Sequence, residues 1–166
     1  MKNSLLSLLI TVFACGAVYA QQAIPMTEND IDMKIQTWHY SRYEKSKEAQ
    51  WTLFAQDGVG TYEVQFVYGG NKVIAAYSED GYILWERSYI SEKNIPVQVT
   101  DLLDYRIVKY KIDNFTKHTE FDEVRKEIGS DYQVLASTKT GGLIEYWFNS
   151  EFELMPEKKG DEVAKR

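Results

Sequence analysis

The sequence predicts an α+β fold, in which two tandem repeats, each a helix followed by a run of strands, form one antiparallel sheet with the helices packed on one face. Ile24-Pro25 with Asp30-Ile31, and Ile95-Pro96 with Asp101-Leu102, share one internal spacing. Residues 62–84 overlay residues 132–154 without a gap at an offset of 70 residues. After each Ile-Pro pair the apolar period falls from about 3.6 to 2. A repeat of this length indicates one supersecondary unit made twice.

Both predicted helices begin close to a proline, which the first helical turn tolerates because its N–H is unused there. Thr27 and Asp30 form a capping-box-like start for the first helix after Pro25. Pro96 opens the second helix. The apolar faces are expected at Ile31, Ile35 and Trp38 in the first helix, and at Val99, Leu102 and Leu103 in the second.

The strands are predicted by alternation and by glycine turns. Tyr62, Val64, Phe66 and Tyr68 alternate with more polar residues, as in a strand with one buried face. Gly69-Gly70 closes a hairpin into 73–77, Asp80-Gly81 closes the next into 83–89, and Gly141-Gly142 separates 132–139 from 143–148. Packing against the helices is the favoured role of Tyr62, Phe66 and Tyr132.

The first 20 residues are interpreted as a signal peptide. Lys2 supplies a positive charge, residues 5–12 are almost wholly apolar, and Val18-Tyr19-Ala20 suits cleavage before Gln21. In an alternative interpretation, residues 12–16 resemble a lipoprotein processing box that would lipidate Cys15, although Phe13 fits it poorly. One domain, 21–156, is then expected from two repeats at about 24–89 and 95–155, followed by a disordered tail at 157–166.

Composition narrows the class of protein. A formal net charge of −6 and a pI near 5.0 argue against a nucleic-acid surface, which needs clustered Lys and Arg. Past the N-terminal segment, no apolar run is long enough to predict a transmembrane helix. Cys15 is the single cysteine, so the mature chain would have neither a disulfide nor a Cys metal ligand.

Catalytic patterns are weak, and neither an enzyme, a cofactor nor a metal site is predicted. His39 and His118 are 79 positions apart, so they are not repeat equivalents, and a surface or capping role is expected for them. Glu79-Asp80 and Asp122-Glu123 are acid pairs that turns and helix starts commonly carry in solvent. The nucleophile, phosphate-loop and zinc motifs of common enzyme classes do not occur.

A family resemblance rests on several loose motifs. The chain has an Ile-Pro helix start, a W-x-x-x-x-x-D-G turn at 51–58, a Tyr-Glu-Val-Gln-Phe strand and an Asp-Gly turn before an aliphatic residue. It resembles the PepSY-like, β-lactamase-inhibitor-protein-like family of bacterial envelope proteins. The second repeat departs from the pattern, with Phe121 for Trp51 and Ser150-Glu151 for the Asp-Gly turn. The resemblance implies a fold of tandem α-β-β-β-β repeats and a role in periplasmic binding or inhibition, without implying a β-lactamase as the target.

Aromatic residues are the best candidates for a binding site, since 14% of the chain is Phe, Trp or Tyr. A sheet covered by helices on one side leaves its other face wet. Rings on that face beside a cation would form a protein-binding surface. The alternative is an aromatic-rich mini-core between the repeats. The candidate residues are Trp85, Tyr77, Trp147, Tyr89, Tyr110 and Arg87, with Lys109 as a second cation.

The leading hypothesis is therefore an exported, periplasmic or extracellular, non-catalytic module that binds a protein or peptide of the cell envelope and could inhibit it. A small-ligand carrier with an aromatic-lined pocket between the repeats is the alternative hypothesis. An enzyme is disfavoured. The sequence indicates neither the partner nor the oligomeric state.

The processing of the N-terminal segment is testable. Mass spectrometry of the exported protein is expected to show a chain that begins at Gln21, because Val18-Tyr19-Ala20 precedes it. An intact Met1, or a lipid on Cys15, would contradict the signal-peptide interpretation.

Overall fold

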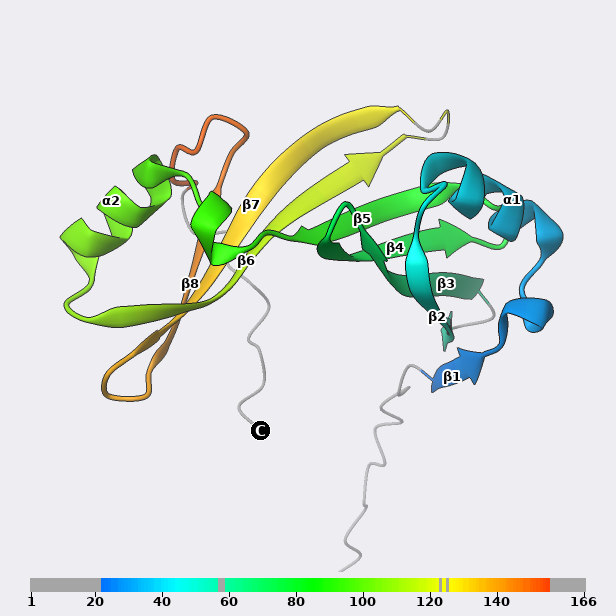
Figure 1. Ribbon diagram of the computed structural model, residues 1–166, viewed down its shortest axis with the longest axis horizontal. Helices are drawn as coiled ribbons and strands as arrows, with labels where there is room; N and C mark the ends of the chain where they lie inside the picture. The colour runs from blue at the N-terminus through cyan, green and yellow to red at the C-terminus, as the bar shows by residue number, and fades with distance from the viewer. Residues whose placement is uncertain (1–21, 57–58, 123, 125, 156–166) are drawn as a thin grey trace, which may run out of the picture.

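The computed structural model describes residues 22–56, 59–122, 124 and 126–155. An eight-stranded antiparallel sheet in the order β1-β2-β3-β4-β5-β6-β7-β8 carries two α-helices (Figure 1). The α+β class and the antiparallel sheet are thus confirmed. The signal peptide at 1–20, the Asp-Gly turn at 57–58 and the tail at 157–166 lie outside the described residues. The strands are β1 (Gln22–Met26), β2 (Lys47–Gln56), β3 (Val59–Tyr68), β4 (Asn71–Ser78), β5 (Ile83–Tyr89), β6 (Tyr110–Phe121), β7 (Glu127–Thr138) and β8 (Leu143–Phe148).

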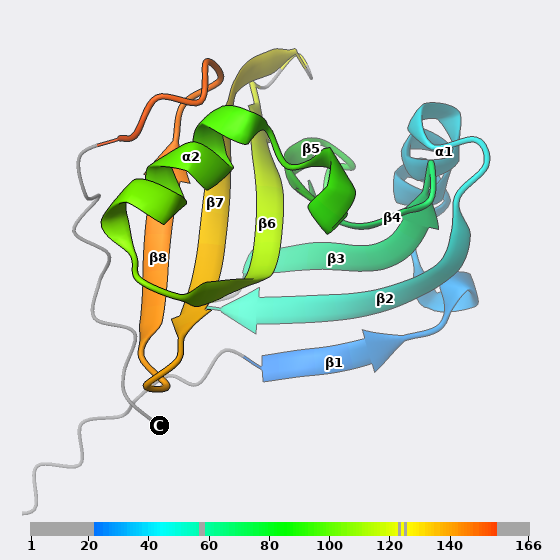
Figure 2. The same ribbon diagram turned by 60° about the vertical axis from the view of Figure 1, so that its left-hand side comes forward.

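The sheet is a strongly twisted meander, in which each strand pairs with the next one in the chain. Figure 2 shows β6, β7 and β8 nearly upright, whereas β1, β2 and β3 run nearly level. A right-handed twist between neighbouring strands accumulates across a wide sheet. The two halves therefore present their strands in different directions while they share one sheet.

Both helices pack on the same side of this sheet. α1 (Met33–Arg42) buries its side chains against β2–β5, and α2 (Val97–Arg106) buries its own against β6–β8. Side chains on a strand alternate between the two faces of the sheet, so every second strand residue faces the helices. Each helix covers a separate apolar cluster of such residues. The first cluster includes Ile35, Trp51, Val64, Phe66 and Tyr77, and the second includes Val99, Leu103, Phe115, Val134 and Phe148.

The start of the first helix differs from the prediction. Pro25 lies in the edge strand β1, opposite Thr52 of β2. Thr27 and Asp30 do form the expected capping box, but on the short 3-10 helix η1 (Glu28–Asp30). α1 begins only after Asp32, whose side chain accepts a hydrogen bond from the Lys34 amide at 2.7 Å. The backbone around Pro25 is extended and pairs with β2, so the same residues cannot form the first turn of a helix. Pro96, by contrast, immediately precedes α2, which follows η2 (Glu92–Asn94).

The connection between β7 and β8 is longer than the one between β3 and β4, so the offset of 70 residues between the two halves is not kept along the last strand. Tyr62 lies opposite Tyr77, whereas Tyr132 lies opposite Phe148, not Trp147. Phe148 therefore occupies in β8 the buried place that Tyr77 has in β4. A shift of one residue turns every following side chain to the other face. Three named strands, not four, follow α2 in the described chain, and the superposition of the two halves stays a prediction.

The expected surface or capping role of His39 is wrong. Its exposed fraction is 0%, and it occupies the third buried position of the Ile31, Ile35, His39 stripe, while Trp38 is 39% exposed. The Nδ1 atom of His39 lies 3.1 Å from the Tyr77 hydroxyl. The ring packs edge-on to Phe66 at 4.7 Å between centroids. This histidine is thus a core side chain that satisfies its polar atoms locally.

Glu86 joins the first helix to the middle of the sheet. Its carboxylate accepts hydrogen bonds from the Tyr43 hydroxyl at 2.5 Å and from the Ser88 hydroxyl at 2.7 Å. Arg42 Nη2 lies 3.6 Å from the same carboxylate. The Arg42 guanidinium also covers the ring of Phe121, which reaches the first core cluster from the end of β6. Side chains of both halves therefore meet at this point.

Truncation of Phe66 tests the assignment of the core face. Phe66 is 1% exposed, so Phe66→Ala should lower the free energy of unfolding by about 3–5 kcal/mol. Tyr105→Ala is the matched control because Tyr105 is 90% exposed, and it should change stability by less than about 0.5 kcal/mol. Denaturant melts measure both values. Equal stability of the two variants would contradict the assigned face.

The buried histidine makes stability depend on pH. Burial lowers the pKa of His39 from 6.5 to about 4, against a smaller opposite effect of Glu28. The unfolded chain then binds more protons than the folded one between these values. The contribution of His39 to the free energy of unfolding should therefore be fully present above pH 6.5, and it should fall by up to about 3 kcal/mol as the pH drops towards 4.

Denaturant melts at several pH values measure this loss. His39→Leu is the control, because Leu103 is the buried leucine at the corresponding position of α2. The difference between wild type and His39→Leu isolates the histidine from the carboxylates that titrate in the same range. Parallel pH profiles of the two proteins would show that His39 does not titrate in this way.

Candidate functional site

The sheet side opposite the helices forms the candidate site and is called the open face here. Glu86 and Ser88 point to the α1 side, so the residues that alternate with them on β5 point away. Phe115, Val134 and Phe148 are likewise buried beneath α2, and their neighbours on β6, β7 and β8 face the other way. The open face includes Trp85, Arg87, Tyr89, Thr116, His118, Glu120, Asp131, Gln133, Glu145 and Trp147.

Four of the six predicted site residues share this face. Trp85, Arg87 and Tyr89 follow one another on β5, and all three are half-buried. Trp147 comes from β8 and is also half-buried. Neither apolar cluster includes these rings, so the described structure places them outside the two cores and not in a mini-core between the halves.

Tyr77 and Tyr110 do not belong to the open face. Tyr77 is 1% exposed and packs in the first core cluster, so its expected exposure is wrong. Tyr110 packs against the second cluster and donates a hydrogen bond from its hydroxyl to Asp104 of α2 at 2.9 Å. Both rings lie on the helix side because strand parity points them there. Lys109 is exposed at the start of β6, away from Arg87.

Hydrogen bonds fix the β6–β8 part of the open face. The Trp147 indole Nε1 donates to Glu145 at 2.6 Å, and the Gln133 side-chain amide donates to the same carboxylate at 2.8 Å. The Trp147 ring lies against His118 with centroids 4.8 Å apart. His118 Nε2 lies 3.3 Å from the Gln133 side-chain oxygen. An aromatic ring held in this way loses little freedom when a partner binds.

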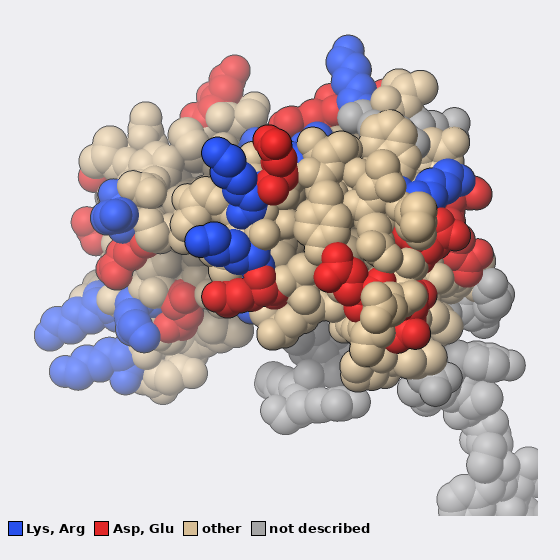
Figure 3. All heavy atoms as spheres, turned by 45° about the vertical axis from the view of Figure 1, so that its right-hand side comes forward, with Lys and Arg blue, Asp and Glu red and all other residues tan. Residues whose placement is uncertain are grey.

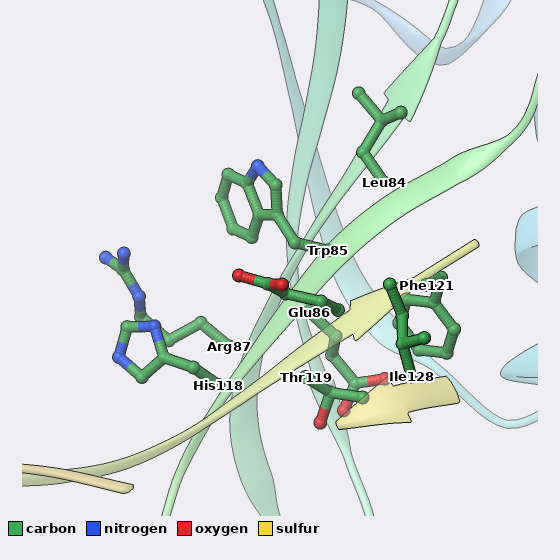
Figure 4. Close-up of a pocket in the computed structure, with 9 residues that line it drawn as sticks. Leu84, Trp85, Glu86, Arg87, His118, Thr119, Phe121 and Ile128 are labelled. Atoms are coloured by element: carbon green, nitrogen blue, oxygen red, sulfur yellow. The ribbon is translucent and has the colours of Figure 1, made fainter. Parts of the chain in front are cut away.

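The β5 part of the open face pairs cations with rings. The Arg87 guanidinium lies 5.6 Å from the centre of the Trp85 ring, and Lys72 Nζ lies 5.2 Å from that of Tyr89. A hollow of about 320 Å³ opens where β5 meets β6 (Figure 4). Its lining joins both sides of the sheet, because Glu86, Thr119 and Phe121 contribute to it from the helix side. Arg87 and His118 lie side by side at one end of it, and they are direct partners in the sheet. Leu84 and Ile128 supply exposed apolar groups elsewhere in its lining.

Charge at this site is incompletely paired. Of the ion pairs between described residues, none includes Arg87. Burial raises the pKa of Glu63, and the positive charge of Arg87 opposes that rise. The Arg87 Nε atom is buried and has no hydrogen-bond partner in the part of the chain that the structure describes. Arg87 thus retains hydrogen-bonding capacity that the described residues do not use.

The described residues hold no group of three or more His, Cys, Asp or Glu side chains placed to bind a metal ion. Within the same residues, no helix is both long and apolar enough to cross a membrane. Figure 3 shows Lys and Arg interspersed with Asp and Glu around an uncharged area. The surface in that view therefore carries charges of both signs.

Sequence reasoning missed the polar part of the open face. Thr116, Gln133 and Glu145 were not candidates, although they hold His118 and Trp147 in place. Alternation along β7 and β8 could have found Gln133 and Glu145, because each follows or precedes an apolar residue. Their mutual contacts needed the register between strands, which no single strand pattern supplies.

Comparisons with solved structures place the fold. A BLIP-like protein from Bacteroides fragilis has a TM-score of 0.59 and 16% sequence identity, over 81% of this chain and 92% of that one. A DUF2874 family protein from Bacteroides uniformis has a TM-score of 0.60 and 12% identity, over 75% of this chain and 86% of that one. A Bacteroides eggerthii protein described as periplasmic has a TM-score of 0.60 and 14% identity, over 75% of this chain and 86% of that one.

These likenesses show a shared fold and no more, because the identities are low. No family model and no curated protein matches the sequence. The BLIP-like part of the family resemblance is supported at the level of the fold. The PepSY-like part stays a prediction.

Proposed function

We propose that the protein is a non-catalytic periplasmic binding module, whose open face holds a protein or peptide of the cell envelope. The observation that carries the proposal is the set of half-buried aromatic rings on a sheet face without helices, with Trp85 and Trp147 on strands of different halves. Tryptophan, tyrosine and arginine are the residues that most often dominate interface energetics. The described face offers all three.

The rigidity of this face supports binding over catalysis. The side chains around Trp147 use their polar atoms on one another, which leaves an ordered, preformed surface. A catalytic site needs a nucleophile with a base, or a metal, in reach of a substrate. The solved structures of the same fold include proteins named as BLIP-like and as periplasmic, which supports the location and agrees with an inhibitory role for this chain.

A small-ligand carrier is the second candidate function. The observation in its favour is the hollow of about 320 Å³ at the β5–β6 junction, which Trp85 lines between the two halves. Its volume is at the lower end of the range of about 300–1,000 Å³ for ligand pockets. It is open to solvent and partly polar, so an exposed docking surface describes it better than a closed apolar cavity does.

Substitution of the two tryptophans tests the proposed function. Trp85→Ala and Trp147→Ala should each weaken the capture of an envelope protein by about 2 kcal/mol or more, which is a roughly 30-fold loss of affinity. Stability should fall much less than in a core variant, because both rings are only half-buried. The measurement is a quantitative pull-down from envelope extract, with thermal melts of every protein.

Tyr105→Ala is the matched control, since its ring is exposed on α2 and lies on the helix side of the sheet. A partner that the wild type and Tyr105→Ala retain, but both tryptophan variants lose, supports the open face. Equal capture by all four proteins would exclude it. Binding of small apolar ligands, with no protein captured, would favour the carrier function.

A further inference from the structure

We propose that Arg87 is the anchor for one carboxylate of the bound partner, which docks at the β5–β6 hollow with an apolar group beside it. This inference rests on the proposed function and names the chemistry that the open face recognises. The partner is thus a polypeptide that presents an acidic side chain, or a free chain end, next to an aliphatic residue.

The position of Arg87 makes it suited to this role. It lies at the centre of a row that crosses the open face, between Ile74 of β4 and His118 of β6. Its side chain packs over Trp85, which holds the guanidinium at the edge of the hollow. Arginine stays charged at all physiological pH values and presents a planar fork that matches a carboxylate.

The unused donor of Arg87 is the second argument. A buried N–H without an acceptor costs about 1–3 kcal/mol. The Nε atom of Arg87 is in that state within the described structure. A carboxylate that displaces the half-buried Trp85 ring slightly can accept from Nε and from a terminal nitrogen together. Binding would therefore recover part of a cost that the free protein carries.

The neighbouring acids limit the site to one carboxylate. Glu63 and Glu120 lie in the adjacent row on either side of Trp85, and Asp131 lies beyond His118. Among the described residues, none of these carboxylates lies within 4.0 Å of the Arg87 guanidinium as an ion pair. They would repel a ligand with several negative charges. A single carboxylate placed at the guanidinium is the arrangement that these charges allow.

The apolar part of the ligand follows from the far end of the hollow, where it passes the end of the β5–β6 pairing and reaches the helix side beside Phe121 (Figure 4). Leu84 is 39% exposed and Ile128 is 66% exposed, and both line it. The pairing of β5 with β6 stops at Trp85 and Glu120, so the two chains diverge beyond that point. Aliphatic groups of this kind accept an aliphatic side chain of the partner next to its carboxylate.

Three acetylated peptides test the proposal on the full mature chain. Acetyl-Leu-Glu-Leu-amide carries a side-chain carboxylate, acetyl-Leu-Gln-Leu with a free carboxyl end carries a terminal one, and acetyl-Leu-Gln-Leu-amide carries none. Titration by NMR, with the Arg Nε–H signals observed directly, measures each affinity. At least one acidic peptide should bind about five- to tenfold more tightly than the neutral one and shift the Arg87 Nε–H signal. The acidic peptide with the higher affinity identifies whether the carboxylate comes from a side chain or from a chain end.

Variants make the test specific for Arg87. Arg87→Gln should abolish the preference for acidic peptides, and Glu63→Gln should increase it by removing a repulsive charge. Lys72→Gln is the matched control, because Lys72 is the other cation stacked on a ring of this face, over Tyr89. It should change the preference less than twofold. If Arg87→Gln does not fold, the Nε–H signal of the wild type and of Glu63→Gln decides.

Three results would overturn the inference. Equal affinity for all three peptides would remove the acidic anchor, while the tryptophan variants would still decide whether the open face binds protein. A preference for acid that survives in folded Arg87→Gln would place the carboxylate elsewhere. If no peptide binds at millimolar concentration, and capture does not depend on Trp85 or Trp147, both the anchor and the proposed function are wrong.

Discussion

The pairing of β5 with β6 is the constraint on which the rest of the structure depends. It is the place where strands of the two halves meet, and it runs from Trp85 opposite Glu120 to Tyr89 opposite Thr116. On the helix side, the partly buried carboxylate of Glu86 ties this junction to the end of α1 through the Tyr43 hydroxyl. Removal of one partner of such a network leaves a buried charge or hydroxyl unsatisfied, which costs more than the contact itself contributes. The junction is therefore held on the helix side by these polar contacts and by Phe121 of β6, which packs in the first apolar cluster, whereas the second cluster comes from the second half and the segment that leads into it.

Strand parity carries that constraint across to the open face. Once Glu86 faces α1, Trp85 and Arg87 must face away, and the register then aligns Arg87 with His118. The side chains of this face stand on paired strands, not on loops, so their spacing is set by the backbone. Trp147 reaches the same surface because the β7–β8 register turns it outward and buries Phe148. The two halves thus share one open face as a result of strand pairing.

The sequence predicts the local elements well and the three-dimensional placement of single residues less well. Glycine turns and alternation predict β5 at residues 83–89 and β8 at residues 143–148, as the structure has them. His39 was assigned to the surface because a histidine is usually solvated, yet helical spacing from Ile31 and Ile35 places it in the core. Tyr77 and Trp147 were treated as equivalent under a constant offset, which one additional residue in a turn invalidates. Of the candidate site, the aromatic and cationic residues of β5 were predictable, but the contacts between Gln133, Glu145 and Trp147 depend on register.

The order of the strands also dictates the order in which the protein can assemble. Each strand neighbours the next one in the chain, so most pairing closes short loops, and such topologies fold rapidly. A chain that becomes available from its amino end can complete β1–β5 and α1 before β6 exists. The open face, in contrast, needs Thr116, Gln133 and Trp147 from the last three strands. A chain that ends before β6 can therefore pair β1–β5 and pack α1 on them, but it lacks Phe121 of the first apolar cluster and half of the open face.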